Sequence, residues 1–268
     1  MSSIIFMAIL ILIMIINKPV LDTIVITSLS ILGIYEFNKA FKGIGYNLIG
    51  WVGYLSCSLI FTMGGLMDDT SKILLIKIGL PAMLIAIFIY VIVTNMKRNV
   101  IDVALTLLSL IYIPFMLSFL KLILMMDNGR LLIWFVFMGA FASDTFGYAI
   151  GTKFGKHKLC PDISPKKTVE GSIGGIIGVI LSYIIITLIA NSSYFGMNLN
   201  MLSVLLAGVI VGIAGQFGDL SASAIKRFCK IKDFSNIMPG HGGILDRFDS
   251  ILFAAPVVYM FLKLYVFM

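Results

Sequence analysis

Charged side chains are scarce in this sequence. Asp, Glu, Lys and Arg make up 12% of the 268 residues, whereas hydrophobic residues make up 60%. Soluble domains carry roughly twice this share of charge, so the composition excludes an ordinary soluble domain. Apolar runs long enough to cross ~30 Å of hydrocarbon recur along the whole chain. We therefore predict an all-α fold, a polytopic transmembrane helical bundle of about nine spans, at residues 3–17, 20–36, 48–66, 73–94, 100–125, 131–151, 172–191, 201–224 and 249–267.

Cysteine and histidine are also rare, with three and two residues. Cys57, Cys160 and Cys229 are too far apart for a disulfide framework or a zinc-ligand spacing. The sequence lacks G-x-x-x-x-G-K-[ST], which excludes a P-loop NTPase. It also lacks G-x-S-x-G and H-E-x-x-H, which argues against an intramembrane serine hydrolase or zinc protease. The first apolar run lacks a basic flank and a cleavage site, so we expect it to be a retained helix.

The basic residues are distributed unevenly between the predicted loops. Loops after the second, fourth, sixth and eighth spans hold most of the 20 Lys and Arg residues. The positive-inside rule places this side in the cytoplasm, including the two most basic loops, 152–171 and 225–248. Any shared functional site would need both loops in one compartment. We divide the chain into N-terminal transmembrane helices, 1–130, and a functional C-terminal transmembrane region, 131–268.

Asp219 lies inside the otherwise apolar eighth span, where an ionised carboxylate costs ~3 kcal/mol on insertion scales. At 100° per residue, Gln216, Asp219, Ser223 and Lys226 fall on one narrow helix face. A polar stripe of this kind faces a bundle interior or a wet cavity. Two interpretations stay open: Asp219 pairs with Lys226 or an arginine only to hold the bundle together, or it binds a cation or substrate.

The end of the sixth span, "FASDTFGYAIGTKFGKHK", combines a deep acid with a glycine repeat. Asp144 lies about two turns before the basic loop, deeper than a solvated loop residue. Gly147, Gly151 and Gly155 recur at every fourth position, which predicts close packing against another helix.

The loop that follows contains paired lysines. Pro161 and Pro165 indicate turns, and Lys166 and Lys167 then precede a predicted helix start at residues 170–172. Lysines beside a helix N-terminus suit phosphate oxygens. They are equally compatible with a simple positive-inside role.

Residues 226–250, "KRFCKIKDFSNIMPGHGGILDRFDS", form an unusually polar stretch. The Pro-Gly-His-Gly-Gly run cannot continue a helix. Gly240, Gly242 and Gly243 would let backbone N–H groups approach a ligand closely. Three interpretations of His241 stay open: a structural turn residue, a hydrogen-bond donor to phosphate, or a proton-donating acid.

Asp246 and Asp249 share a helix face at the start of the last span. Acids are favourable at a helix N-terminus, so both could be simple caps. Together with Asp219, however, they offer carboxylates from different helices without a His or Cys cluster. Such all-oxygen ligands select Mg²⁺ over zinc. Lys and Arg residues around a carboxylate-held Mg²⁺ indicate a polyphosphate site.

The stretch "SAIKRFCKIKDFSNIMPGHGGILDRFD", residues 223–249, resembles the signature of the phosphatidate cytidylyltransferase (CDP-diacylglycerol synthase) family. That signature reads Ser-x-apolar-Lys-Arg, four residues, Lys-Asp, then Pro-x-His-Gly-Gly-apolar-x-Asp-Arg-apolar-Asp. Every fixed position matches, and the one departure, Met238, exchanges one apolar residue for another. "SDTFGYAIGTKFGKHKL" and "SPKKTVEGSIGG" resemble further shared stretches, so the likeness covers about residues 140–255.

The resemblance implies an enzyme that converts CTP and phosphatidate to CDP-diacylglycerol and pyrophosphate with Mg²⁺. It implies an integral protein of the bacterial cytoplasmic (inner) membrane, with the active site facing the cytoplasm. It also implies a homodimer, a monovalent cation such as K⁺ beside Mg²⁺, and no nucleic acid partner. Transferred to the matching positions, the family's roles give metal ligands (Asp219 and Asp246), further carboxylates for metal or supporting work (Asp249 and Asp144), phosphate-binding residues (Lys226, Arg227, Arg247, Lys166 and Lys167) and substrate-positioning residues (Ser223 and His241).

Three other functions compete with this interpretation. A CDP-alcohol phosphotransferase would need a D-G-x-x-A-R run, which is absent. An ion-coupled membrane transporter would use intramembrane carboxylates as cation relays, but predicts inverted repeats with broken helices. A lipid-binding scaffold without turnover would need none of the carboxylates.

Overall fold

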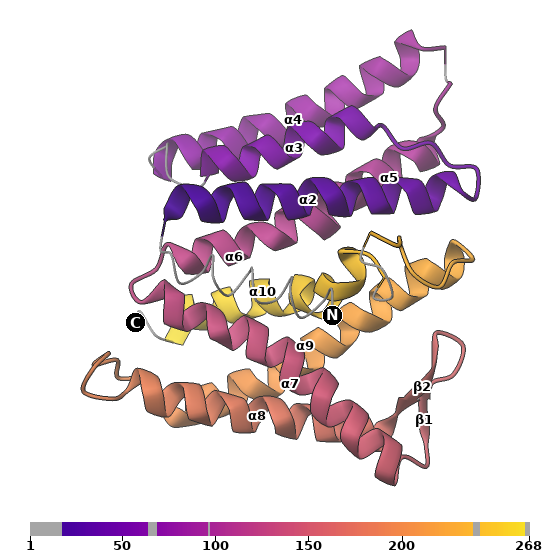
Figure 1. Cartoon of the computed structure of the whole chain (residues 1–268). Coiled ribbons are helices and arrows are strands. Elements are labelled where there is room, and N and C mark those ends of the chain that lie inside the picture. Colours follow the sequence, from indigo (N-terminus) through magenta and orange to yellow (C-terminus); the bar gives the residue numbers. More distant parts are fainter. Residues whose placement is uncertain (1–17, 64–68, 96, 238–241, 266–268) are drawn as a thin grey trace. The chain divides into compact units, whose positions relative to one another are not determined.

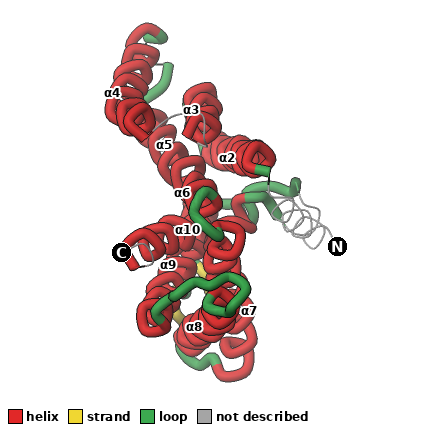
Figure 2. The backbone as a smooth tube through the Cα atoms, turned by 90° about the vertical axis from the view of Figure 1, so that its left-hand side faces the viewer, coloured by secondary structure: helices red, strands yellow, loops and turns green. Residues whose placement is uncertain are grey.

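The computed structural model describes residues 18–63, 69–95, 97–237 and 242–265, which are almost entirely helical (Figure 1, Figure 2). Every predicted span from 20–36 onward is a helix, so the all-α class is confirmed. The predicted span 3–17 lies outside the described residues. The helices are α2 (Pro19–Lys42), α3 (Gly50–Met63), α4 (Asp69–Val93), α5 (Val100–Leu110), α6 (Met116–Leu124), α7 (Gly129–Phe154), α8 (Val169–Ala190), α9 (Met201–Phe228) and α10 (Leu245–Tyr265), with a π-helical turn, Ile111–Phe115, joining α5 to α6.

Five helices among the described residues are long and apolar enough to cross a membrane. They are Pro19–Lys42, Val100–Leu124, Gly129–Phe154, Val169–Ala190 and Met201–Phe228. The chain is therefore an integral membrane protein. The predicted count of nine spans is not confirmed, because α3, α4 and α10 are not among the five.

The chain divides into two compact units. The first comprises Met1–Lys121 with Cys229–Leu245, and the second comprises Leu122–Phe228 with Asp246–Met268. Of the polar stretch 226–250, the part Cys229–Leu245 thus belongs to the first unit, and the chain enters the second unit at Asp246. The predicted division at residue 130 was a functional one and stays a prediction.

In the first unit, α2 packs against α3 and against the π-helical turn. Ile49, Val52, Ile87 and Val91 belong to its buried core. Asp102 adds polar contacts to this packing, because its carboxylate accepts hydrogen bonds from the backbone N–H of Asn47 at 2.7 Å and of Asn99 at 3.0 Å. This buried carboxylate therefore caps α5 and fixes the turn that precedes α3.

In the second unit, α7 packs closely along α8, and α8 packs on α9. Glycines make the α7–α8 approach possible. A Cβ at Gly147 would lie 3.3 Å from the Gly171 carbonyl oxygen, and one at Gly151 would lie 3.0 Å from Thr168 Oγ1. The predicted packing role of the glycine repeat is confirmed. Deeper in the unit, Tyr183 of α8 donates to the Phe135 carbonyl at 2.8 Å.

A short antiparallel hairpin connects α7 to α8, where the sequence predicted only a loop. Strands β1 (Lys158–Cys160) and β2 (Ser164–Thr168) pair with a shift of register between the Lys158–Thr168 and Cys160–Ser164 pairs. Thr168 ends β2 and also caps α8, because its Oγ1 accepts the Gly171 N–H at 3.1 Å. Helix α8 consequently begins at Val169, one residue before the predicted start, and the paired lysines lie on β2.

Candidate functional site

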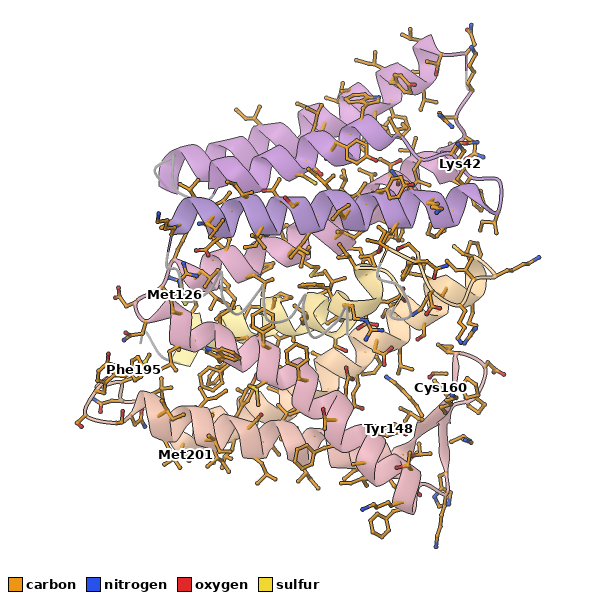
Figure 3. The ribbon with its side chains drawn as sticks, in the orientation of Figure 1. Lys42, Met126, Tyr148, Cys160, Phe195 and Met201 are labelled. Atoms are coloured by element: carbon orange, nitrogen blue, oxygen red, sulfur yellow. The ribbon has the colours of Figure 1, made fainter. Side chains whose placement is uncertain are left out.

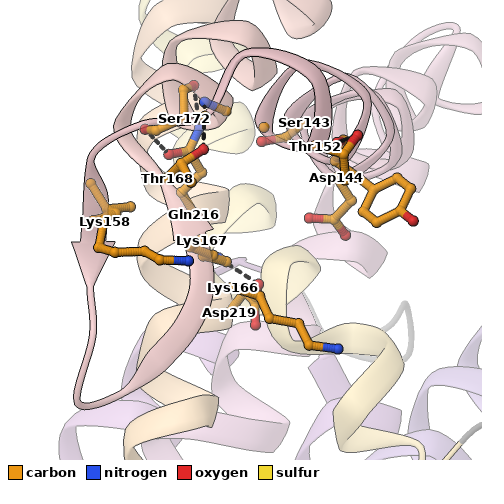
Figure 4. A pocket seen from close by; sticks show the side chains of 16 residues that line it. Ser143, Asp144, Thr152, Lys158, Lys166, Lys167, Thr168, Ser172, Gln216 and Asp219 are labelled. Carbon is orange, nitrogen blue, oxygen red and sulfur yellow. Dashed lines mark hydrogen bonds and ion pairs between the residues drawn. The ribbon is translucent and has the colours of Figure 1, made fainter.

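A cavity of about 570 Å³ opens between α7, the hairpin, α8 and α9 (Figure 4). The side chains of this region are drawn in Figure 3, where Tyr148 of α7 and Cys160 of β1 are labelled. Four elements of the second unit supply its walls. Its charged lining residues are Asp144 from α7, Lys158, Lys166 and Lys167 from the hairpin, and Asp219 from α9.

Lys167 and Asp219 form an ion pair across the cavity. Lys167 Nζ lies 2.5 Å from Asp219 Oδ2, and the two side chains are 26% and 25% exposed. Ser223, one turn further along α9, donates from Oγ to Asp219 Oδ1 at 3.4 Å. The deep acid of the eighth span therefore faces the wet cavity predicted from its helical stripe, and its cation comes from the hairpin.

Two further carboxylates lie near Asp219. Asp144 of α7 is within electrostatic range of Asp219, Lys167 and Arg247. Asp249 of α10, a buried residue, is within electrostatic range of Asp219 and Asp144. Carboxylates from α7, α9 and α10 thus repel one another in one region of the second unit.

Lys226 and Asp246 make a second ion pair, which is more buried than that of Lys167 with Asp219. Lys226 Nζ donates to Asp246 Oδ1 at 2.6 Å, and the side chains are only 13% and 5% exposed. The pair joins the end of α9 to the start of α10. Close packing continues at Gly218, where a Cβ would collide with the Asp249 carbonyl oxygen.

Arg227 and Arg247 are not among the residues that line the cavity. Arg227 donates from Nε to the Ile163 carbonyl at 3.2 Å, so it fastens the hairpin tip to α9. Arg247 follows Asp246 in the first turn of α10. His241 lies outside the described residues.

Some residues that shape the cavity were not predicted. Ser172 donates to the side-chain oxygen of Gln216, whose Nε2 donates back to the Ser172 carbonyl at 2.9 Å. This pair fixes the start of α8 against α9. Ser143 also lines the cavity, and its buried hydroxyl has no hydrogen-bond partner among the described residues. Of Ser143, Ser172 and Gln216, only Gln216 could be suspected from the sequence, because it shares the polar helix face with Asp219.

Comparison with known proteins assigns the chain to a family. Residues 1–265 match the profile of the Cytidylyltransferase family. The chain belongs to this family. Phosphatidate cytidylyltransferase from Staphylococcus haemolyticus is 37% identical over 184 residues, 69% of this chain and 68% of that protein. The enzymes of the same name from Bacillus subtilis and Thermotoga maritima are 37% identical over 199 residues (74% and 71%) and 38% identical over 157 residues (59% and 58%).

Membership makes this cytidylyltransferase a nucleotidyltransferase, an enzyme that moves a nucleotidyl group. Its donor is therefore a polyphosphate. Ammonium and guanidinium groups are the kind of side chain that binds such a ligand, and the hairpin and the ends of α9 and α10 carry them. Their role in binding stays a prediction.

The donor chemistry of the site also fits Mg²⁺. In the part of the chain that the structure describes, no three His, Cys, Asp or Glu side chains are grouped to hold one metal ion. Mg²⁺ does not need such a cage, because one or two carboxylates suffice when substrate phosphates and water complete its shell. Asp219 and Asp246 carry carboxylate oxygens of the kind that Mg²⁺ prefers, and each has a lysine ammonium group within 2.6 Å. Their assignment as metal ligands stays a prediction.

Proposed function

We propose that this cytidylyltransferase transfers CMP from CTP to phosphatidate, giving CDP-diacylglycerol and pyrophosphate in phospholipid biosynthesis. The observation that carries the proposal is the cavity in which Lys158, Lys166 and Lys167 approach the acids of α7 and α9. The names of the relatives support phosphatidate as the acceptor. The apolar helices support a lipid substrate as well, because a membrane-embedded enzyme can receive it from the bilayer.

The reaction needs little covalent chemistry from the protein. An oxygen of the phosphatidate phosphate attacks the α-phosphorus of CTP, a new P–O bond forms, and the bond to the β-phosphate oxygen breaks. The attacking oxygen is already anionic at pH 7, so no strong general base is required. The difficulty lies in bringing two polyanions together and in stabilising the leaving pyrophosphate.

The residues at the site meet these two requirements by charge and by position. Lys166 and Lys167 reach the cavity from β2 and can neutralise phosphate oxygens. Lys226, beside Asp246, provides a third ammonium group, and Arg227 and Arg247 provide guanidinium groups at the same helix ends. Ser223 is placed to orient a ligand beside Asp219.

Asp219 and Asp246 are the residues that would hold Mg²⁺, with Asp144 and Asp249 as supporting carboxylates. When bound, Mg²⁺ supplies charge neutralisation for the transferred phosphoryl group and the leaving pyrophosphate. A neighbouring monovalent cation and a homodimer stay predictions. So does the orientation of the site toward the cytoplasm, from which CTP would enter.

Incorporation of radiolabelled CTP into lipid tests the proposal. Detergent-purified protein is incubated with phosphatidate and CTP labelled in the cytidine, with Mg²⁺ or with EDTA. We expect label in the organic phase only when divalent metal is present. A folded, monodisperse protein that incorporates no label with Mg²⁺ and CTP would refute the function, and a transporter or scaffold would give that result.

A further inference from the structure

Glu36 of α2 is a carboxylate that the site described above does not use. Its side chain is completely buried, at 0% exposure, in the first unit. Its partners lie 199 to 209 positions further along the chain. Ser235 Oγ donates to Oε1 at 2.5 Å, and the backbone N–H groups of Ile244 and Leu245 donate to Oε1 and Oε2 at 2.9 and 2.8 Å. An ionised carboxylate only accepts hydrogen bonds, so three donors suit it well.

The Gly-Gly pair at the end of the polar stretch is shaped around this carboxylate. Gly242 has a φ of +79°, a left-handed conformation that favours glycine. A Cβ at Gly243 would lie 2.5 and 2.6 Å from the two carboxylate oxygens of Glu36. The sequence interpretation gave Gly243 the role of admitting a ligand. In the structure, the Glu36 carboxylate occupies the space beside it.

Glu36 also caps the helix that begins at Leu245. The first N–H groups of a helix lack partners within it, and negative charge is favourable there. Here the cap comes from another helix and not from the preceding residue. The Leu245 side chain, 2% exposed, reinforces the contact by packing at Gly33, one turn before Glu36. The residue after Leu245 is Asp246.

We propose that Glu36 is a positioning residue for the nucleotidyl transfer: its buried carboxylate fixes the backbone of Gly242–Leu245 and thereby the first turn of α10, in which Asp246 directly follows Leu245. The inference rests on the proposed function, because it gives Asp246 a role in turnover. It gives a residue from the N-terminal part of the chain a role in turnover through the backbone that leads into α10.

Glu36→Gln is the variant that tests this role. Its amide oxygen can replace only one carboxylate oxygen, and the amide NH₂ then faces a backbone N–H of Ile244 or Leu245, so one donor is left without an acceptor. In the CTP incorporation assay we expect kcat to fall at least tenfold. The Mg²⁺ concentration for half-maximal rate should rise at least threefold, while the KM for CTP changes less than twofold.

Asp102→Asn is the matched control. Asp102 is also a buried carboxylate of the first unit that accepts two backbone N–H groups, but its partners, Asn47 and Asn99, do not belong to the polar stretch or to α10. It should lower the thermal stability by a similar amount and leave kcat and the Mg²⁺ dependence within twofold of wild type. Equal kinetic effects of E36Q and D102N would reduce Glu36 to a structural residue.

Ser235→Ala removes one donor to Glu36 without creating a conflict, so it decides the matter if E36Q does not fold. We expect a two- to fivefold lower kcat with the same direction of change in Mg²⁺ dependence. The inference would be overturned if S235A had wild-type kinetics and E36Q either did not fold or was as active as the wild-type protein. A wild-type protein without any turnover would instead refute the proposed function, and the inference with it.

Discussion

Single residues at the site are held in pairs of opposite charge. Lys167 lies 2.5 Å from Asp219, and Lys226 lies 2.6 Å from Asp246. A phosphate oxygen is the same kind of acceptor as a carboxylate oxygen, so either lysine can exchange one for the other. In the proposed function, the acids of these pairs would bind a metal ion and the ammonium groups would bind phosphate oxygens.

Asp219→Asn and Asp246→Asn test the acidic members. Each change keeps the shape of the side chain but removes the negative charge that attracts a divalent cation. We expect the CTP incorporation rate to fall by at least about 100-fold in each variant, with wild-type amounts of protein in the membrane. Near-wild-type rates in both variants would contradict the metal assignment. Asp127→Asn, an exposed acid in the loop before α7 and outside the signature, is the control and should remain active.

Lys226→Met tests the buried pair. It leaves the Asp246 carboxylate, 5% exposed, without the ammonium group bonded to it, a loss that costs about 3–5 kcal/mol in buried pairs. We expect a lower melting temperature and loss of turnover. Adding Asp246→Asn should recover much of the stability but none of the activity, because it removes the buried carboxylate charge together with a predicted metal ligand. Recovery of both would show that the pair is only structural.

At the scale of elements, helices were easier to predict than contacts. Apolar runs bounded by polar loops predicted the helices from α2 to α10 because each run alone carries the signal. The hairpin was missed because "KLCPDISPKK" contains two prolines and reads as turns. The partners of Glu36 and of Gln216 lie 199 and 44 positions away, and no local pattern can predict such pairs. The carboxylates were predicted because charge inside an apolar helix is conspicuous.

The close packing of α7 on α8 predicts a strong effect of a single methyl group. A Cβ at Gly171 would lie 2.7 Å from the Gly147 carbonyl oxygen and 3.1 Å from Gly151 Cα, and backbone atoms cannot move aside. We expect Gly171→Ala to destabilise the protein by about 1–3 kcal/mol. Gly79→Ala in α4 is the control, because a Cβ there meets nothing within 4 Å. Melting curves in detergent compare the two, and equal values would disprove the packing argument.

The hairpin depends on Glu170, which accepts the backbone N–H groups of Lys156 and His157 and lies 2.7 Å from His157 Nδ1. Glu170→Gln weakens this attachment. Because the hairpin carries lysines of the cavity, we expect the KM for CTP to rise roughly two- to tenfold, with a smaller change in kcat. Trypsin should also cleave the hairpin faster. His157→Ala keeps the backbone bonds and should have the smaller effect; an unchanged KM in E170Q would contradict the role of the hairpin in binding CTP.

For the molecule as a whole, the distribution of basic residues predicts one orientation in the membrane. Two of the apolar helices, α8 and α9, separate the hairpin from the loop that follows α9, so both basic segments return to the same side. The loop between α8 and α9, "NSSYFGMNLN", contains no Lys or Arg. The positive-inside rule then places the hairpin in the cytoplasm and this loop outside.

Single cysteines at exposed positions test that orientation. In a variant without Cys57, Cys160 and Cys229, a cysteine replaces Lys156, Lys232 or Tyr194, all of which are exposed. A membrane-impermeant maleimide applied to intact spheroplasts should label Y194C and leave K156C and K232C unlabelled until the membrane is opened. Labelling of K156C and K232C on opposite sides would separate the hairpin lysines from Asp246 and rule out a shared site. Labelling of both K156C and K232C from outside would be compatible with a shared site but would reverse its orientation. CTP could then not reach the site from the cytoplasm.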